Sequence, residues 1–191
     1  MPSIYDELYR ELNYYGKAIP DILNYFKDLP KRLTILDVGC GQGRYTIPLA
    51  EMGFNVTALD NSHVALKQLR QRITDSKLEI KILHTNAYSF TEYGKFDLLF
   101  LNLFFHFQNF NLKDEQRLIQ TILSGIAPGS KTLFVVHESN KSKGELLNAI
   151  TSVIGIKVNH QKSLVYKNIS SPLNPPENTS YFIVIAEKEL W

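Results

Sequence analysis

Cysteine is nearly absent from this chain of 191 residues, and so are long apolar runs. The one cysteine, Cys40, excludes a disulfide within the chain and favours a reducing compartment. No stretch approaches the roughly 18 uninterrupted apolar residues that indicate a membrane-spanning helix. The first residues, MPSIYDELYRELNYYG, are charged and tyrosine-rich and lack the apolar centre of a signal peptide. We therefore expect a soluble, cytoplasmic protein with no membrane partner.

An excess of charge of one sign is also missing. The 21 basic and 19 acidic residues leave a net charge of +2, which provides no sequence-wide electrostatic argument for binding nucleic acid. The lysines between residues 157 and 167 are scattered through a predicted strand and form no basic stripe. A hydrophobic content of 44% is ordinary for a globular chain. The length suits a single domain, and we place no domain boundary within residues 1–191.

What the chain does have is a strand, glycine loop, helix and strand pattern at residues 33–62, LTILDVGCGQGRYTIPLAEMGFNVTALDNS. An apolar run from Leu33 to Val38 enters a loop that carries three glycines, Gly39, Gly41 and Gly43. Glycines let a backbone bend sharply and approach a ligand, and the free N–H groups of the next helix face the same gap. The second apolar run stops at Asp60, where a carboxylate can accept hydrogen bonds from ribose hydroxyls. This pattern predicts a nucleotide-containing cofactor.

The glycine spacing distinguishes between cofactors. The dinucleotide fingerprint is G-x-G-x-x-G, whereas this loop reads G-x-G-x-G and has Arg44 where the third small residue of the fingerprint belongs. Asp37 precedes the first glycine by two positions. This stretch resembles motif I of the class I S-adenosylmethionine-dependent methyltransferases, and its continuation resembles the small methyltransferases of the tellurite-resistance type. The resemblance implies S-adenosylmethionine as cofactor and S-adenosylhomocysteine as product.

Alternating strands and helices predict an α/β fold with a mostly parallel sheet and helices on both faces. The last two predicted strands lack a helical crossover, so the final strand should run antiparallel to its neighbour. The resemblance adds a Rossmann-like class I methyltransferase fold with seven strands, the last of them reversed. Residues 1–30 are expected as N-terminal helices over the cofactor edge, and residues 31–191 as the core that binds S-adenosylmethionine.

The individual elements follow from periodicity and capping signals. We expect N-terminal helices at 3–15 and 21–27, a helix after Gly43, a helix capped by Asn61 or Ser62, and a helix capped by Asn111. Ser142-Lys143-Gly144-Glu145 is the pattern of a capping box for a further helix. Strands are expected at 78–83, 96–103, 132–136, 157–169 and 181–187.

The resemblance also assigns a candidate cofactor site at the strand ends. Asp37 and the glycine loop would hold the methionine part, Asp60 the ribose and Asn61 the flank of the adenine. Asn86 takes the place of a family acid that contacts the adenine amino group, and its amide oxygen can still accept that bond. The full expected set is Asp37, Gly39, Cys40, Gly41, Gly43, Asp60, Asn61, Asn86, Ala87 and Asn102, with no metal ligand.

Each of these residues has a structural alternative. Asp60 also suits a helix-capping role, Asn86 a plain turn, and Cys40 a small loop residue. His106 is the candidate general base because it follows the fourth strand, and burial against backbone is the competing interpretation. A phenylalanine cluster, Phe104, Phe105, Phe107 and Phe110, is either an acceptor-pocket wall or core, with core favoured. Tyr14 and Tyr15 suit either a lid over the cofactor or ordinary helix packing.

The function we expect is methyl transfer from S-adenosylmethionine to a small or medium acceptor by in-line attack on the methyl group. A base is needed only when the acceptor must lose a proton. The alternatives are a non-catalytic module that binds S-adenosylmethionine and acts through a partner, and a nucleotide-dependent oxidoreductase, which the glycine spacing disfavours. The partner is expected to be a small-molecule acceptor; the sequence indicates neither the acceptor atom nor the oligomeric state.

Overall fold

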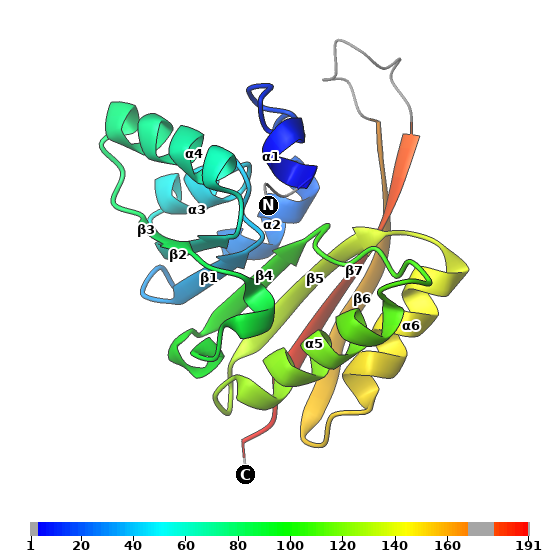
Figure 1. Ribbon diagram of the computed structural model, residues 1–191. Helices are drawn as coiled ribbons and strands as arrows, with labels where there is room; N and C mark the ends of the chain where they lie inside the picture. The colour runs from blue at the N-terminus through cyan, green and yellow to red at the C-terminus, as the bar shows by residue number, and fades with distance from the viewer. Residues whose placement is uncertain (1–3, 168–177, 191) are drawn as a thin grey trace. The chain divides into compact units, whose positions relative to one another are not determined.

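Strands and helices alternate along the chain around one sheet. A computed structural model of the protein describes residues 4–167 and 178–190 (Figure 1). The sheet has seven strands in the order β3-β2-β1-β4-β5-β7-β6. The pairs β1–β2, β2–β3 and β4–β5 are parallel, whereas β7 is antiparallel to both β5 and β6. This confirms the predicted Rossmann-like class I methyltransferase fold with its reversed last strand.

The chain divides into two compact units. The first contains the described residues up to Ser89, and the second contains Phe90–Lys167 and the described residues from Asn178 onward. The elements of the first unit are α1 (Ile4–Leu8), α2 (Pro20–Lys27), β1 (Thr34–Val38), α3 (Thr46–Glu51), β2 (Asn55–Asp60), α4 (His63–Ser76), β3 (Lys81–His84) and a 3-10 turn, η1 (Ala87–Ser89).

Apolar side chains of α3 and α4 pack on β2 in the first unit. Ile47 of α3, Ala58 of β2, and Leu66 and Leu69 of α4 share one buried cluster with Cys40 of the glycine loop. Their spacing on α4 is the helical repeat seen in the sequence. Through Cys40, this packing fixes the loop between β1 and α3 against the core of the first unit.

The second unit holds the rest of the sheet. Its elements are η2 (Tyr93–Lys95), β4 (Leu98–Asn102), α5 (Leu112–Gly125), β5 (Lys131–His137), α6 (Asn140–Thr151), β6 (Ile156–Lys167) and β7 (Asn178–Lys188). β4 and β5 are buried along nearly their whole length, as expected for parallel strands covered on both faces. None of the helices within residues 4–167 and 178–190 is long and apolar enough to cross a membrane.

The predicted helix at 3–15 is wrong beyond Leu8. The helix α1 ends there, and Asn13 then takes a left-handed backbone conformation with φ of 56°. The carbonyl oxygen of Tyr9 accepts a hydrogen bond from the Gln68 side chain, and that of Glu11 accepts one from Gln42. These carbonyls are therefore taken by side chains distant in sequence rather than by the N–H groups of a continuing helix.

Two boundary predictions are also wrong. The capping box lies three residues earlier than predicted: Ser139 accepts from the Ser142 N–H, and Ser142 Oγ accepts from the Ser139 N–H. The third strand begins at Lys81 rather than Leu78, because Leu78 N–H donates to Ile73 O and still closes the end of α4.

The other predicted elements agree with the structure to within a few residues, and Ser62 is confirmed as the cap of α4 because its side chain accepts from Ala65 N–H. Residue 3 of the first predicted helix and residues 168 and 169 of the predicted strand at 157–169 lie outside the described residues.

Candidate functional site

The glycine loop leaves β1 in a conformation that glycine favours. Gly39, Gly41 and Gly43 all have positive φ, at 72°, 53° and 83°. The N–H groups of Gly39 and Cys40 donate to Leu59 O at 2.7 and 3.1 Å, which ties the start of the loop to β2. A Cβ on Gly43 would lie 2.5 Å from Leu69 Cδ1, so this glycine allows the close approach of α4 to the loop.

Asp60 connects the end of β2 to the glycine loop. Its Oδ2 accepts from Gly41 N–H at 2.8 Å, and its Oδ1 accepts from Ser62 N–H at 2.7 Å. Burial raises the pKa of this carboxyl, and the amide bonds oppose that rise. The backbone of Asn61 contributes a further hydrogen bond that lowers this pKa, so three N–H groups share the four lone pairs of the carboxylate. Asp60 thus holds the loop in place and retains acceptor capacity for a further donor.

Asp37 is the second acid at this loop. It is 3% exposed and accepts a hydrogen bond of 2.6 Å from Thr46 Oγ1, at the start of α3. Burial raises the pKa of Asp37 to about 7, the Thr46 bond opposes the rise, and the negative charge of Asp60 adds to it. The pKa of the buried Cys40 thiol is also raised, by burial and by both carboxylates, so this thiol stays neutral and unreactive.

Two buried carboxyl groups at one glycine loop define what the loop accepts. The negative charge of Asp60 adds to the rise in the pKa of Asp37, as expected for two carboxyl groups that repel each other when both are ionised. A cationic group relieves that repulsion, whereas a pyrophosphate would add two further negative charges beside it. The donor and acceptor set therefore suits a ligand with a cationic end and a ribose, and it disfavours a dinucleotide.

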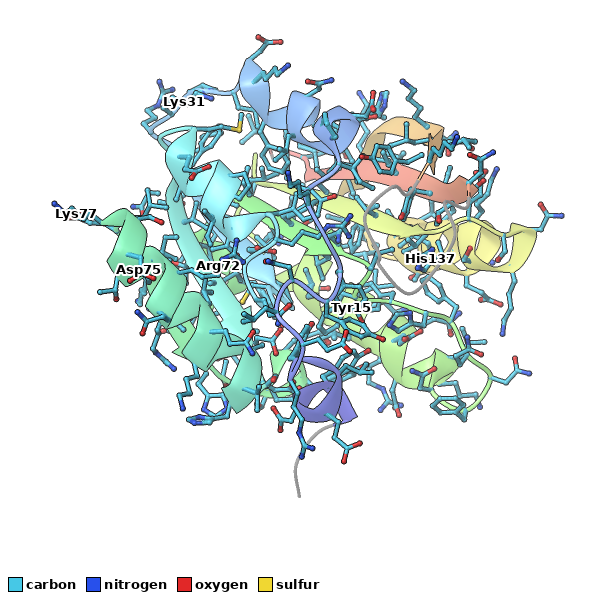
Figure 2. All side chains as sticks on the ribbon, turned by 90° about the horizontal axis from the view of Figure 1, so that it is seen from above. Tyr15, Lys31, Arg72, Asp75, Lys77 and His137 are labelled. Carbon is cyan, nitrogen blue, oxygen red and sulfur yellow. The ribbon has the colours of Figure 1, made fainter. Side chains whose placement is uncertain are left out.

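An N-terminal segment, residues 5–17, lies over this loop; we call it the N-terminal strap. Tyr9 is 6% exposed, and a Cβ on Gly41 would lie 2.6 Å from the Tyr9 hydroxyl oxygen, so the ring lies directly on Gly41. Tyr9 also makes ring contacts with Tyr5 and Tyr15. Figure 2 shows Tyr15 on the strap and Arg72 on α4. The Nη1 of Arg72 donates to Gln42 O at 2.6 Å.

The other predicted cofactor residues of the first unit lie just after the strand ends. Asn61 is exposed, and its carbonyl oxygen lies 3.2 Å from His84 Nε2. Asn86 is exposed, and its Oδ1 accepts from Tyr88 N–H at 2.9 Å, which is the turn geometry of the structural alternative. Ala87 is buried and opens η1. The structure thus bonds Asp60 directly to the glycine loop, places Asp37 just before that loop with its carboxylate bonded to Thr46, and places Asn61 and Asn86 at the surface.

In the second unit, the segment after β4 is held by a buried acid. Asn102 ends β4 and is half-buried, and His106 is exposed. Glu115, 2% exposed in the first turn of α5, accepts from His106 N–H at 3.0 Å and from Phe107 N–H at 2.6 Å. Two consecutive backbone N–H groups, one of them on a residue with positive φ, form an anion nest, and the Glu115 carboxylate is the anion that it binds.

The phenylalanines that the sequence groups together differ in burial. Phe105 and Phe107 are buried with stacked rings 6.1 Å apart, and Phe105 also contacts Phe134 of β5. Phe110 is 88% exposed. The core interpretation therefore holds for Phe105 and Phe107, whereas Phe110 lies at the surface.

Sequence reasoning missed four residues that shape the site: Tyr9, Gln42, Thr46 and Gln68. Gln42 stands inside the glycine motif, yet nothing in the motif indicates that its side chain bonds the strap. Thr46 follows Asp37 by nine positions, and only the bend of the glycine loop brings the hydroxyl to the carboxylate. The residue spacing around Tyr9 and around Gln68 predicts only an ordinary helix face in each case.

The fold and the loop define a class of protein: an α/β protein with the strand order of the doubly wound folds, a class in which ligands bind beyond the carboxyl ends of the strands. Comparison with known families narrows this class. The model of the methyltransferase-domain family matches residues 35–129, which include β1, the glycine loop and β2. The chain belongs to the class I S-adenosylmethionine-dependent methyltransferases, whose cofactor is S-adenosylmethionine.

Individual proteins agree with this family. The chain is 33% identical over 146 residues to YqeM, a candidate methyltransferase of Bacillus subtilis (strain 168), covering 73% of this chain and 55% of YqeM. It is 28% identical over 126 residues to a ubiquinone biosynthesis O-methyltransferase of Rickettsia canadensis (strain McKiel), covering 65% of this chain and 50% of the relative. The chain thus spans about half the length of the curated relatives it matches.

Among solved structures, TehB from Haemophilus influenzae superimposes with a TM-score of 0.71 at 16% identity, over 97% of this chain and 67% of TehB. This likeness shows a common fold.

Proposed function

We propose that this chain transfers a methyl group from S-adenosylmethionine to a small or medium acceptor molecule. The observation that carries the proposal is the pair of buried carboxyl groups, Asp37 and Asp60, at a loop of positive-φ glycines. S-adenosylmethionine combines a ribose with a sulfonium, an α-ammonium and one α-carboxylate, which leaves it cationic overall. It therefore matches this site in both shape and charge, whereas NAD brings a pyrophosphate to a loop that already has two acids.

The roles of the residues follow from their free acceptor capacity. The remaining acceptor capacity of Asp60 serves the ribose hydroxyls while its bonds to Gly41 and Ser62 stay in place. Asp37 supplies negative charge to the methionine end, and Cys40 and the three glycines form the floor. Asn61 and Ala87 flank the base. Asn86 keeps one lone pair of Oδ1 for the adenine amino group.

The chain's own residues have little covalent chemistry to perform. S-adenosylmethionine supplies an activated methyl group on a sulfur that leaves readily, so the protein contributes mainly alignment and exclusion of water. His106 is our candidate to accept a proton from an acceptor that must lose one, and Asn102 is our candidate for a polar contact at the end of β4. The Glu115 nest holds the backbone of His106, which keeps this side chain out of the core.

We further propose an oxygen acceptor on a small molecule. Support comes from relatives named as ubiquinone biosynthesis O-methyltransferases, including the one from Rickettsia canadensis. The nearly balanced charge of the chain gives no support for a nucleic-acid acceptor. A hydroxyl acceptor is also the kind that needs a base, which is the role proposed for His106.

Two experiments test the function. Thermal unfolding with S-adenosylhomocysteine at a hundredfold excess over Kd should stabilise the chain by about 2.7 kcal/mol, or roughly 5–10 °C, while NAD should produce no rise. Asp60→Asn should lose most of this shift, because an amide nitrogen replaces one carboxylate oxygen. The exposed Asp75→Asn on α4 is the matched control. A rise with NAD and none with S-adenosylhomocysteine would reject the cofactor.

Turnover is then measured as S-adenosylhomocysteine released from S-adenosylmethionine across a panel of phenols and catechols. We expect at least one phenol to support multiple turnovers and His106→Ala to lower kcat/KM by about 10²–10⁴ for it. Firm cofactor binding with no turnover on any acceptor would instead favour a non-catalytic module that acts through a partner.

A further inference from the structure

The ring of Tyr9 and an adenosyl ligand compete for the same surface of the glycine loop. A Cβ on Gly41 would lie only 2.6 Å from the Tyr9 hydroxyl oxygen, so the ring already occupies the open side of this glycine. Gly41 is also the residue whose N–H bonds Asp60, the proposed ribose acceptor. A ligand that reaches Asp60 across Gly41 therefore requires that Tyr9 move first.

The strap is held in this position by Gln42, from within the glycine motif itself. Gln42 is 6% exposed, and its Nε2 donates to Glu11 O at 2.6 Å and to Gln68 Oε1 at 2.5 Å. Its Oε1 accepts from Tyr14 N–H at 2.9 Å. Gln68 of α4 completes the arrangement by donating to Tyr9 O at 2.7 Å. We call Gln42 and Gln68 the latch.

Residues at both edges of the cofactor loop hold the remainder of the strap. Asp6 Oδ1 accepts from Ser62 Oγ at 2.6 Å, and Ser62 is the cap that also donates its N–H to Asp60. Arg44 Nε donates to Lys17 O at 2.8 Å. The strap is thus bonded to the same short segments that would bind the cofactor, so the two events are physically coupled.

We propose that the N-terminal strap is a gate on the cofactor site, closed by Tyr9 and latched by Gln42 and Gln68, which must open before an adenosyl ligand binds. The identity of the ligand rests on the proposed function, whereas the gate rests on the contacts of Tyr9 and the latch. The apparent association constant equals the association constant of the open state multiplied by the fraction of molecules that are open. Each latch contact that is lost raises that fraction.

The gate predicts an effect on the rate of association. Gln68→Ala removes a side chain that bonds Tyr9 O but belongs to α4, outside the glycine motif. It should raise the association rate constant for S-adenosylhomocysteine about fivefold, as expected when one buried hydrogen bond that favours the closed state is lost. Gln42→Ala should raise it further. Gln71→Ala is the matched control, because Gln71 is exposed on the same helix and its side chain bonds Asp75 within that helix.

Variants of Tyr9 separate the ring from its hydroxyl. Tyr9→Phe keeps the volume over Gly41 and should associate at the wild-type rate, whereas Tyr9→Ala opens the surface and should associate at least as fast as Gln68→Ala. Stopped-flow tyrosine fluorescence with S-adenosylhomocysteine as the probe measures these rates in the full chain. Circular dichroism spectra matching those of the wild type confirm that each variant is folded.

Trypsin supplies a second readout, because Arg10 and Lys17 of the strap are exposed. If the ligand displaces the strap, saturating S-adenosylhomocysteine should accelerate cleavage after Arg10; slower cleavage would show a lid that closes over the ligand and would overturn the gate.

Equal association rates for wild type, Gln68→Ala and Tyr9→Ala would also overturn the gate while leaving the cofactor assignment intact. Failure of every variant to bind the probe would reject the cofactor assignment and the gate together.

Discussion

Binding of S-adenosylhomocysteine should become stronger as pH rises toward 7.5, because of Asp37. In the ligand-free protein burial raises the pKa of this carboxyl from 3.8 to about 7, so below pH 7 it is mostly protonated. The α-ammonium of the ligand favours the ionised carboxylate and lowers that pKa in the complex. Binding below pH 7 therefore releases a proton, and affinity rises with pH.

The size of the effect follows from the two protonation states. If Asp37 is ionised throughout in the complex, Kd should be about 10- to 30-fold larger at pH 5.5 than at pH 7.5. The stability of the ligand-free protein should move the opposite way. The pKa of Asp37 is higher in the folded protein than in the unfolded chain. Its contribution to the free energy of unfolding is therefore greatest below pH 3.8 and is lost as pH rises through 7. Between pH 5.5 and 7.5 that loss is about 2 kcal/mol.

Isothermal titration calorimetry in two buffers of different ionisation enthalpy measures both Kd and the number of protons released. Asp37→Asn should bind more weakly at pH 7.5 and lose most of the pH dependence, while the exposed Asp75→Asn keeps the wild-type curve. Asp60, whose pKa is also raised, accounts for any slope that remains in Asp37→Asn. A Kd that is constant between pH 5.5 and 7.5, or proton uptake on binding, would refute the charge argument for this site.

Three further substitutions test the scaffold by chemical denaturation. Glu115→Ala leaves the buried Phe107 N–H and the partly buried His106 N–H without their acceptor and should cost about 2–4 kcal/mol, whereas the exposed Asp114→Ala should cost less than about 0.5 kcal/mol. Ser139→Ala removes one half of the capping box of α6 and should cost about 1 kcal/mol, and a value near zero would show that the cap is redundant. Gly43→Ala places a side chain at φ of 83° against Leu69 and should cost about 1–3 kcal/mol; no loss would mean that the loop relaxes freely.

Much of the fold could be predicted because its signals are local. Apolar runs of strand length, glycines at the loop and Ser62 at a helix start each act through neighbours a few residues away. The same is true of Asp37 and Asp60, since an acid at a strand end stays at the strand end wherever the strand is placed. The antiparallel β7 followed from the missing crossover alone.

Predictions failed where distant residues compete for the same backbone groups. The helix expected at 3–15 ends at Leu8 because Gln68, 59 residues away from Tyr9 in sequence, takes the Tyr9 carbonyl. The predicted capping box failed because Ser142 N–H already donates to Ser139 Oγ, while Glu145 accepts from Gln116 of the neighbouring helix α5. The helix prediction thus lost to a hydrogen bond that exists only after the chain has packed, whereas the capping box lost to a second local pattern three residues earlier.

The chain's amino-acid order by itself determined three properties of the glycine loop: where it bends, which acids flank it, and that its spacing resembles the loop of S-adenosylmethionine-dependent methyltransferases. Only the tertiary structure decided that Tyr9 covers Gly41 and that the buried Asp37 holds its proton up to about pH 7. The reason is that conformational preference is a property of neighbouring residues, whereas burial and electrostatic coupling sum over everything that surrounds a group.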